Sequence, residues 1–159
     1  MMREMRRQDR KLEAEEVKDI LKRGEYGVLA TVTPDGLPYS IPMSYAYDEE
    51  ENAIYLHCTV EGGQKIDNIS ANPHVCFTVV SETEVMAEKF ATKYWSANAM
   101  GEIITVKDTE EKKKGLFRLI RKYSRGFEEK GLKYIDSAVD KVNVLKLNIS
   151  SMSGKARKK

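Results

Sequence analysis

Cysteine and histidine are scarce in this chain of 159 residues, which contains two of each. Cys58 and Cys76 form no Cys-x-x-Cys motif, and two cysteines with two histidines make a poor ligand set for zinc. The sequence therefore predicts no metal site. Reduced thiols are the simplest expectation, as in most proteins of the cytoplasm.

Long apolar runs and a large net charge are also absent. No stretch is long enough to span a bilayer, and the basic N-terminus lacks the apolar core of a signal peptide. We therefore expect a cytoplasmic protein with no membrane partner. The formal net charge is only +2, which argues against bulk electrostatic binding of nucleic acid.

The composition is that of an ordinary soluble domain, with 41% hydrophobic and 33% charged residues. The length fits a single domain over residues 1–159 with its own buried core, and no repeat or linker divides it. Basic residues gather at both ends, and we expect solvated, partly disordered basic tails at residues 1–11 and 152–159. The residues that would instead reach an anion are Arg6, Arg7 and Lys155.

Four helices are predicted. Residues 13–23 place Val17, Ile20 and Leu21 on one face, and Gly24 is a natural stop. A short helix should cover 65–71. The other two are a helix that begins after Asp108, with Leu116, Phe117, Ile120 and Tyr123 on its apolar side, and a helical piece over residues 127–138.

Six strands are predicted between these helices. Pro42 indicates an edge, a bulge or an interruption in its strand, and Gly101 indicates a kink or bulge. A polar connection is expected over 81–89. The predicted strands are 26–32, 37–47, 53–57, 74–80, 90–107 and 142–149. Hairpin-linked strands followed by a helical excursion favour an antiparallel barrel with helices packed outside.

Several segments resemble one protein family, in the order that family shows and over nearly the whole chain. They are MRR at 5–7, GVLAT at 27–31, DGLPYSIPMSY at 35–45, IYLHC at 54–58, GQKID at 63–67, NP at 72–73 and MSGK at 152–155. This set resembles the pyridoxamine 5′-phosphate oxidase-like flavoproteins, nearest the branch of nitroimidazole-resistance (Nim-type) reductases. The resemblance implies a six-stranded antiparallel split β-barrel with flanking helices. It also implies a homodimer, with flavin mononucleotide (FMN) held in a groove between the subunits.

The phosphate of FMN has the clearest expected site. The family has Gly-His-Lys where this chain has Gly63, Gln64 and Lys65. A glycine turn followed by Lys65 at a helix start offers backbone N–H groups, a positive dipole end and an ammonium. The alternative is an ordinary turn with a surface lysine. The glutamine weakens any function that needs an imidazole at this position.

Other residues are expected around the flavin ring and ribityl chain. A proline-interrupted strand leaves backbone groups free for the polar rim of the ring, and Trp95 is expected to cover the ring from the neighbouring subunit. The alternatives are ordinary core packing, a structural His57, and an interface role for Trp95. The full expected cofactor-binding set is Pro42, Met43, Ser44, Tyr45, His57, Cys58, Thr59, Gln64, Lys65, Trp95 and Ser96.

The resemblance implies an FMN-dependent oxidoreductase that passes electrons from a nicotinamide donor, NADH or NADPH, to a small organic substrate. In such enzymes the cofactor carries the chemistry and the protein orients it, so no catalytic side chain is singled out. Nitroaromatic reduction is the family's most concrete example. Pyridoxamine phosphate oxidation is disfavoured, because that enzyme's basic substrate-binding motif is not recognised near the C-terminus. The alternative is a non-catalytic protein that stores or senses flavin, or holds haem.

Overall fold

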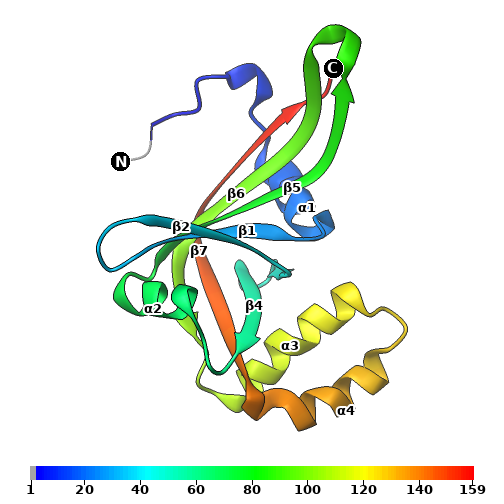
Figure 1. Ribbon diagram of the computed structural model, residues 1–159. Helices are drawn as coiled ribbons and strands as arrows, with labels where there is room; N and C mark the ends of the chain where they lie inside the picture. The colour runs from blue at the N-terminus through cyan, green and yellow to red at the C-terminus, as the bar shows by residue number, and fades with distance from the viewer. Residues whose placement is uncertain (1–2) are drawn as a thin grey trace.

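The computed structural model describes residues 3–159 (Figure 1). Seven strands form one antiparallel sheet in the order β2-β1-β5-β6-β7-β4-β3. Their bounds are β1 Gly27–Val32, β2 Pro38–Met43, β3 Ala46–Asp48, β4 Ala53–Thr59, β5 His74–Met86, β6 Ala91–Thr105 and β7 Val142–Arg157. Within the described residues the sheet is not closed, because β2 and β3 form its two edges.

Within residues 3–159, four α-helices and three single 3₁₀ turns accompany the sheet. The α-helices are α1 Ala14–Arg23, α2 Gln64–Ala71, α3 Thr109–Tyr123 and α4 Glu128–Ala138, and the turns are η1 Gln8–Arg10, η2 Ala87–Lys89 and η3 Val139–Lys141. All four predicted helices are therefore confirmed within a residue or two. None of the described helices is long and apolar enough to cross a membrane.

The prediction of six strands is wrong by one, because the segment predicted as a single strand over 37–47 is two strands. β2 pairs with β1 up to Met43, and the chain then leaves that ladder at Ser44 and Tyr45 before β3 pairs with β4. The interruption expected from Pro42 lies just after it. The ring of Tyr45 is fully buried and its hydroxyl donates to the carbonyl of Leu21 at 2.6 Å. A side chain anchored in this way pulls the backbone out of the sheet.

Two strands, β5 and β7, are much longer than predicted, and β4 extends two residues beyond its predicted end. β5 continues to Met86 and pairs with β6, so most of the polar connection expected over 81–89 is a hairpin that projects from the body of the sheet (Figure 1). The side chains of this hairpin are largely exposed. An alternating apolar pattern reveals a strand only when one of its faces is buried, whereas backbone pairing between strands does not require buried side chains. The bulge expected in β6 is confirmed, since the register with β7 shifts between Met100 and Gly101.

β7 runs to Arg157, well beyond its predicted end at Ile149, so most of the expected tail at 152–159 is paired strand. The buried positions of this extension hold small residues, so the alternation of large apolar side chains that predicts a strand is missing here. Gly154 and Ala156 are buried, and a Cβ on Gly154 would lie 2.5 Å from Val17 Cγ2 of α1. At the other end of the chain, the N–H of Leu12 donates to the carbonyl of Gly154 at 3.1 Å.

The helices are defined by their caps and apolar faces. The Asp108 side chain accepts from the N–H of Glu111 at 2.8 Å, which confirms the predicted cap of α3. α1 starts with a reciprocal capping box between Glu13 and Glu16. Its predicted face, Val17, Ile20 and Leu21, is buried in the main core.

A second, smaller core forms where α3 and α4 cover the other end of the sheet. Leu116 and Leu119 of α3 and Ile135 of α4 pack in it with Tyr55 and Val144 of the sheet. This packing sets the distance between the two helices and the end of β4. It therefore shapes the hollow that the next section describes.

An ion network also fixes α3 to the sheet. Lys146 of β7 lies 2.7 Å from a carboxylate oxygen of Glu51 and 2.8 Å from one of Glu111. Lys114 pairs with Glu51 as well, and the Tyr55 hydroxyl donates to Glu51 at 2.8 Å. The contacts from Lys114, Lys146 and Tyr55 lower the pKa of Glu51 to about 2.

Candidate functional site

A largely apolar cavity of about 560 Å³ lies between the end of β4, the junction of β2 with β3, and the paired helices α3 and α4. Its volume falls in the range of small-molecule sites. One side is polar and is formed by four of the residues expected to bind cofactor, which are Ser44, His57, Cys58 and Thr59. The structure therefore brings these four together, although two segments of the chain supply them.

The end of β4 explains why these side chains reach the cavity. Ala53 to Leu56 are buried, and the side chains become accessible from His57 onward. Although the His57 side chain is accessible, the protein around it removes part of the water from its imidazole, which lowers the pKa of His57 and keeps the ring neutral near pH 7. Burial raises the pKa of the Cys58 thiol, and the nearby charge of Lys65 only partly offsets this. Cys58 is therefore a thiol rather than a reactive thiolate.

The start of α2 lies just beyond Thr59. Gly63 is the N-terminal cap residue, with φ of 123°, a value that favours glycine, and no side chain caps this helix end. Among the described residues, nothing accepts a hydrogen bond from the N–H groups of Gln64 and Lys65. No carboxylate lies within ion-pair distance of Lys65 in residues 3–159. Unpaired N–H groups and an unpaired ammonium together suit an anion.

Gln64 points its amide into the protein rather than toward a ligand. Its Nε2 donates to Asn68 Oδ1 at 2.7 Å, and Asn68 Nδ2 donates to Thr31 Oγ1 at 2.8 Å. Asn68 is fully buried. The residue that replaces the family histidine therefore belongs to a hydrogen-bonded chain that ties α2 to β1.

Tyr123 holds the junction of β2 with β3. Its hydroxyl accepts from the N–H of Tyr45 at 2.9 Å and donates to the carbonyl of Glu25 at 2.5 Å. The side chain of Tyr45 is part of the core, packed edge-on against Phe77 at 4.9 Å between ring centroids. Only the backbone of Tyr45 is near the cavity, and its N–H is already bonded to Tyr123.

The remaining expected residues do not line this cavity. Pro42 and Met43 end β2, with Met43 packed against the main core. Trp95 and Ser96 lie on β6 opposite Ala156 and Lys155 of β7, where Ser96 Oγ donates to the carbonyl of Lys155 at 3.2 Å. Within one chain, the structure therefore separates Trp95 and Ser96 from the residues at the end of β4.

The apolar wall of the cavity was not among the expected site residues. It consists of Leu116, Leu119, Ile120 and Tyr123 from α3, with Tyr134, Ile135 and Ala138 from α4. The apolar stripe of α3 was visible in the sequence, but periodicity does not tell a face that fills a core from one that lines a hollow. The same stripe does both here.

The fold and this site can be compared with known proteins. The family model described as pyridoxamine 5′-phosphate oxidase matches residues 13–156. No curated protein sequence matches the chain.

Three solved structures show the same fold. A candidate 5-nitroimidazole antibiotic resistance protein from Bacteroides thetaiotaomicron is 24% identical, over 92% of this chain and 86% of that one, with a TM-score of 0.75. An FAD-binding protein from Mesorhizobium loti is 24% identical, over 94% of this chain and 98% of that one, with a TM-score of 0.65. An FAD- and haem-binding protein from Mycobacterium smegmatis is 17% identical, over 92% of this chain and 72% of that one, with a TM-score of 0.75.

Proposed function

This chain belongs to the pyridoxamine 5′-phosphate oxidase family, and we propose that it binds FMN and passes electrons from a nicotinamide donor to a small organic substrate. The observation that carries the proposal is the cavity at the end of β4, where a polar edge from two chain segments faces an apolar wall from α3 and α4. An FAD-binding protein and an FAD- and haem-binding protein of similar fold support a flavin as the cofactor, and the choice of FMN rests on the sequence resemblance.

The residues present fit a flavin phosphate at one end of this site. The uncapped start of α2 offers N–H groups, and Lys65 adds an unpaired ammonium close to Cys58. The loop that leads there begins at Thr59, whose hydroxyl suits a ribityl or phosphate oxygen. We assign the phosphate contact to Lys65 and the neighbouring backbone.

The other end of the site fits an aromatic ring and a small substrate. A bound flavin would supply hydride and electron transfer. This chain's residues then bind and orient: Ser44 and His57 offer polar contacts, and the side chains of α3 and α4 exclude water. His57 is neutral near pH 7, so it can donate or accept a hydrogen bond without changing charge. The apolar wall favours an uncharged aromatic substrate.

One observation favours a second candidate function. His57 lies at the edge of an apolar cavity with its imidazole uncharged, and neutral imidazole is the usual protein ligand of haem iron. A protein of similar fold from Mycobacterium smegmatis binds both FAD and haem. The alternative is therefore a non-catalytic protein that stores or senses flavin or holds haem.

The absorbance spectrum of the purified protein separates these functions. Flavin gives bands in the blue and near ultraviolet, whereas haem gives a Soret band. Anaerobic mixing with NADH or NADPH then tests turnover: bleaching of the flavin bands supports the oxidoreductase, and unchanged bands support a binding protein.

The phosphate assignment is tested by Lys65→Ala. A charge-assisted contact to phosphate is worth roughly 1.5–3 kcal/mol, so FMN should bind about ten- to a hundred-fold more weakly. Riboflavin lacks the phosphate, and its affinity should hardly change. Fluorescence quenching measures both ligands, with Lys133→Ala on α4 as the control. An equal loss for both ligands would show that Lys65 acts through structure, and the phosphate assignment would be wrong.

A further inference from the structure

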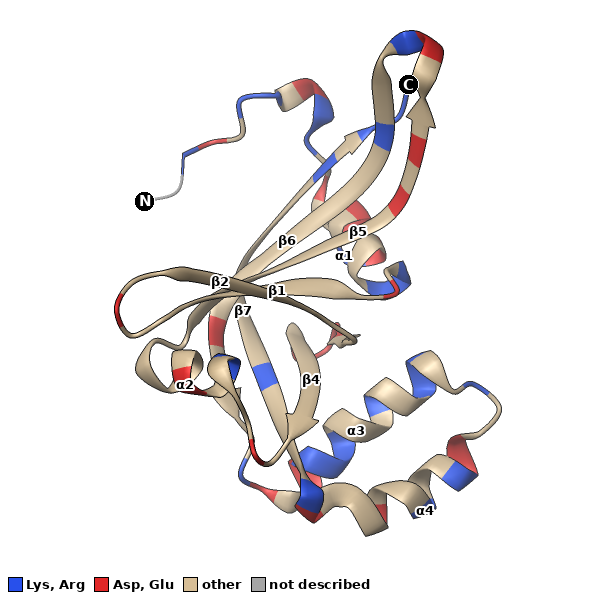
Figure 2. Cartoon of the chain, viewed as in Figure 1, with Lys and Arg blue, Asp and Glu red and all other residues tan. Residues whose placement is uncertain are grey.

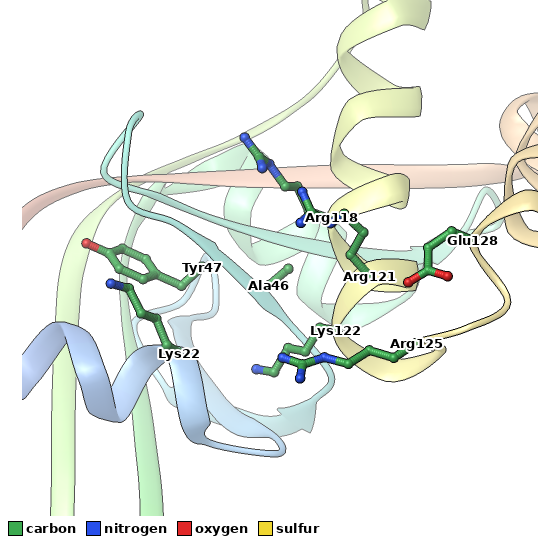
Figure 3. Close-up of a pocket in the computed structure, with 8 residues that line it drawn as sticks. All are labelled: Lys22, Ala46, Tyr47, Arg118, Arg121, Lys122, Arg125 and Glu128. Carbon is green, nitrogen blue, oxygen red and sulfur yellow. The ribbon is translucent and has the colours of Figure 1, made fainter.

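A second cavity, of about 470 Å³, lies between the end of α1, β3 and the C-terminal half of α3 (Figure 3). Its lining is strongly basic. The basic residues are Lys22, Arg118, Arg121, Lys122 and Arg125, and the one acidic lining residue is Glu128. The Glu128 carboxylate accepts from the N–H of Gly126 at 2.9 Å, so it is partly engaged by its own loop.

The cations gather here because of their spacing along α3. Arg118, Arg121 and Lys122 follow one another at steps of three and one residues, which places them on one side of the helix, and Arg125 follows in the turn just after the end of α3. Figure 2 shows the basic bands along α3. Positive side chains in a last helical turn also stabilise the helix dipole. The helix dipole accounts for cations near the C-terminal end of α3, but it does not account for their side chains lining one cavity.

Most of this positive charge lacks a negative partner. Arg118 lies 2.8 Å from Asp48 Oδ2, and Lys22 pairs with Glu49. For Arg121, Lys122 and Arg125, no carboxylate of residues 3–159 lies within ion-pair distance. Ion pairs therefore neutralise the charges of Arg118 and Lys22, whereas the positive charges of the other three residues are not neutralised by a carboxylate of the described residues.

Lys122 shows the imbalance most clearly. Its Nζ is shielded from solvent and has no hydrogen-bond partner within the described residues. Arg118 Nε is likewise buried without a hydrogen-bond partner there. The ammonium lies 3.4 Å from the centroid of the Tyr45 ring and 5.3 Å from that of the Tyr123 ring, and neither ring offers it a hydrogen-bond acceptor of the strength of an anion. Burial lowers the pKa of Lys122 to about 8. A buried ammonium without a hydrogen-bond acceptor is costly unless a ligand supplies one.

We propose that this cavity binds the phosphate group of an organic phosphate. Phosphate offers several charged acceptor oxygens, and arginines contact such groups with paired N–H donors. The side chains of Lys122 at the end of α3 and of Arg125 in the turn after it extend toward α1, where one group can meet both (Figure 3). The cavity volume exceeds what a lone inorganic anion needs and falls in the range of small-molecule sites.

The neighbouring surface shows where the organic part of such a ligand would lie. A further hollow shares Lys22, Lys122 and Arg125 with the basic cavity, and it shares Ser44 and Tyr123 with the apolar cavity at the end of β4. The three hollows are therefore contiguous. A ligand with its phosphate on α3 can extend past Tyr123 toward the apolar cavity. The phosphate assignment itself does not depend on flavin binding.

The test is calorimetric titration of the full-length protein as purified, at low ionic strength, with adenosine 2′,5′-bisphosphate and with inorganic phosphate. We expect the nucleotide to bind more tightly than inorganic phosphate, and we expect its affinity to fall as salt is added. In Arg121→Gln/Arg125→Gln its affinity should fall at least about tenfold. The two arginine side chains are exposed, so this variant should fold.

The matched control is Lys112→Gln/Lys133→Gln, which removes the same charge from α3 and α4 outside the cavity. Its affinity should stay within about twofold of the parent. An equal loss in both double variants would mean that net charge alone attracts the nucleotide, and it would overturn the site. Absence of nucleotide binding would also overturn it. Equal affinity for inorganic phosphate would overturn the assignment to an organic phosphate.

Discussion

At the scale of single residues, Gln64 stands where the sequence resemblance implies a histidine. An amide cannot take up or release a proton near neutral pH, and this one is engaged with Asn68 at 2.7 Å. The position therefore contributes to the attachment of α2 and supplies no proton. A ligand beside Lys65 would meet an uncharged, fixed neighbour.

This leads to a prediction about substrate range. With FMN bound, the parent protein should reduce nitroimidazoles weakly or not at all, and Gln64→His should raise that activity by restoring a titratable group. Turnover with a nicotinamide donor measures both. Gln64→Ala is the control, because it removes the amide without adding an imidazole. Robust nitroimidazole reduction by the parent would contradict the prediction.

Lys122 gives a second residue-scale prediction, on stability. Replacing a buried, unpaired ammonium by an apolar side chain of similar length removes a desolvation cost. Lys122→Met should therefore raise the free energy of unfolding by about 1 kcal/mol at pH 7. Chemical denaturation measures this, with Lys133→Met, a largely exposed position, as the control. Loss of stability in Lys122→Met would show that the contact with Tyr45 outweighs burial.

The pH dependence of that difference has a definite sign. Below about pH 8 Lys122 is charged in both the folded and unfolded states, and the full cost of its burial is present. Between about 8 and the ordinary value of 10.5 the folded state loses the proton first. The unfolded state then binds more protons, so the parent gains stability relative to Lys122→Met as the pH rises. The advantage of the variant should shrink across this window.

At the scale of elements, the placement of α3 matters most, because this helix lines both cavities. Glu51→Gln weakens the contacts of Glu51 with Lys114, Lys146 and Tyr55. These groups are partly exposed, so the expected loss at pH 7 is only about 1 kcal/mol. Because folding lowers the pKa of Glu51 from 4.5 to about 2, its contribution is present above pH 4.5 and disappears as the pH falls toward 2. The destabilisation should shrink in that range.

The measurement is urea denaturation from pH 7 down to pH 2, with Glu88→Gln in the exposed turn η2 as the control. A destabilisation of Glu51→Gln that stayed constant down to pH 2 would mean that the carboxylate charge is irrelevant. In that case the variant would act through packing around Tyr55.

The elements themselves show what a sequence reveals and what it does not. α1 and the cap of α3 follow from local patterns, and both were predictable. The break between β2 and β3 depends on Tyr45 reaching Leu21 and on Tyr123, which is 78 residues away, reaching Tyr45. No local pattern contains such contacts. The end of β7 was hidden because Gly154 and Ala156 pack through close approach rather than through bulk.

The candidate site divides in the same way. The turn before Lys65 and the polar end of β4 were visible as motifs, and the structure places His57, Cys58 and Thr59 on one cavity. The basic face of α3 was not singled out from the sequence, because spacing alone does not separate a solvated face from the wall of a cavity. That distinction comes from α1 and β3, which the fold brings opposite this face.

At the scale of the whole molecule, we predict a two-fold homodimer that buries on the order of 1,600 Å² or more. The separation of Trp95 from Lys65 within one chain fits a flavin site that two subunits complete. Light scattering measures the mass in solution. A monomer with full flavin occupancy would contradict the prediction.

Mixed dimers make this prediction sharper. Lys65→Ala and Trp95→Ala should each weaken FMN binding when present in both subunits. In a heterodimer of the two variants, one site combines the intact Lys65 of one subunit with the intact Trp95 of the other. Co-expression with two affinity tags isolates that species, which should regain about one site per dimer. No recovery would show that Trp95 does not act across the interface.

The prolines of β2 have a further consequence for how copies of this protein meet. β2 is an edge strand, and Pro38 and Pro42 stand in it opposite Val32 and Val28. Proline has no N–H, so the outer edge lacks donors at alternate outward positions and cannot template a continuous ladder with another chain. Strand addition at this edge is blocked, which protects an otherwise open sheet from edge-to-edge aggregation. Association through the β2 edge is therefore disfavoured, and contacts on that side of the molecule depend on side-chain packing.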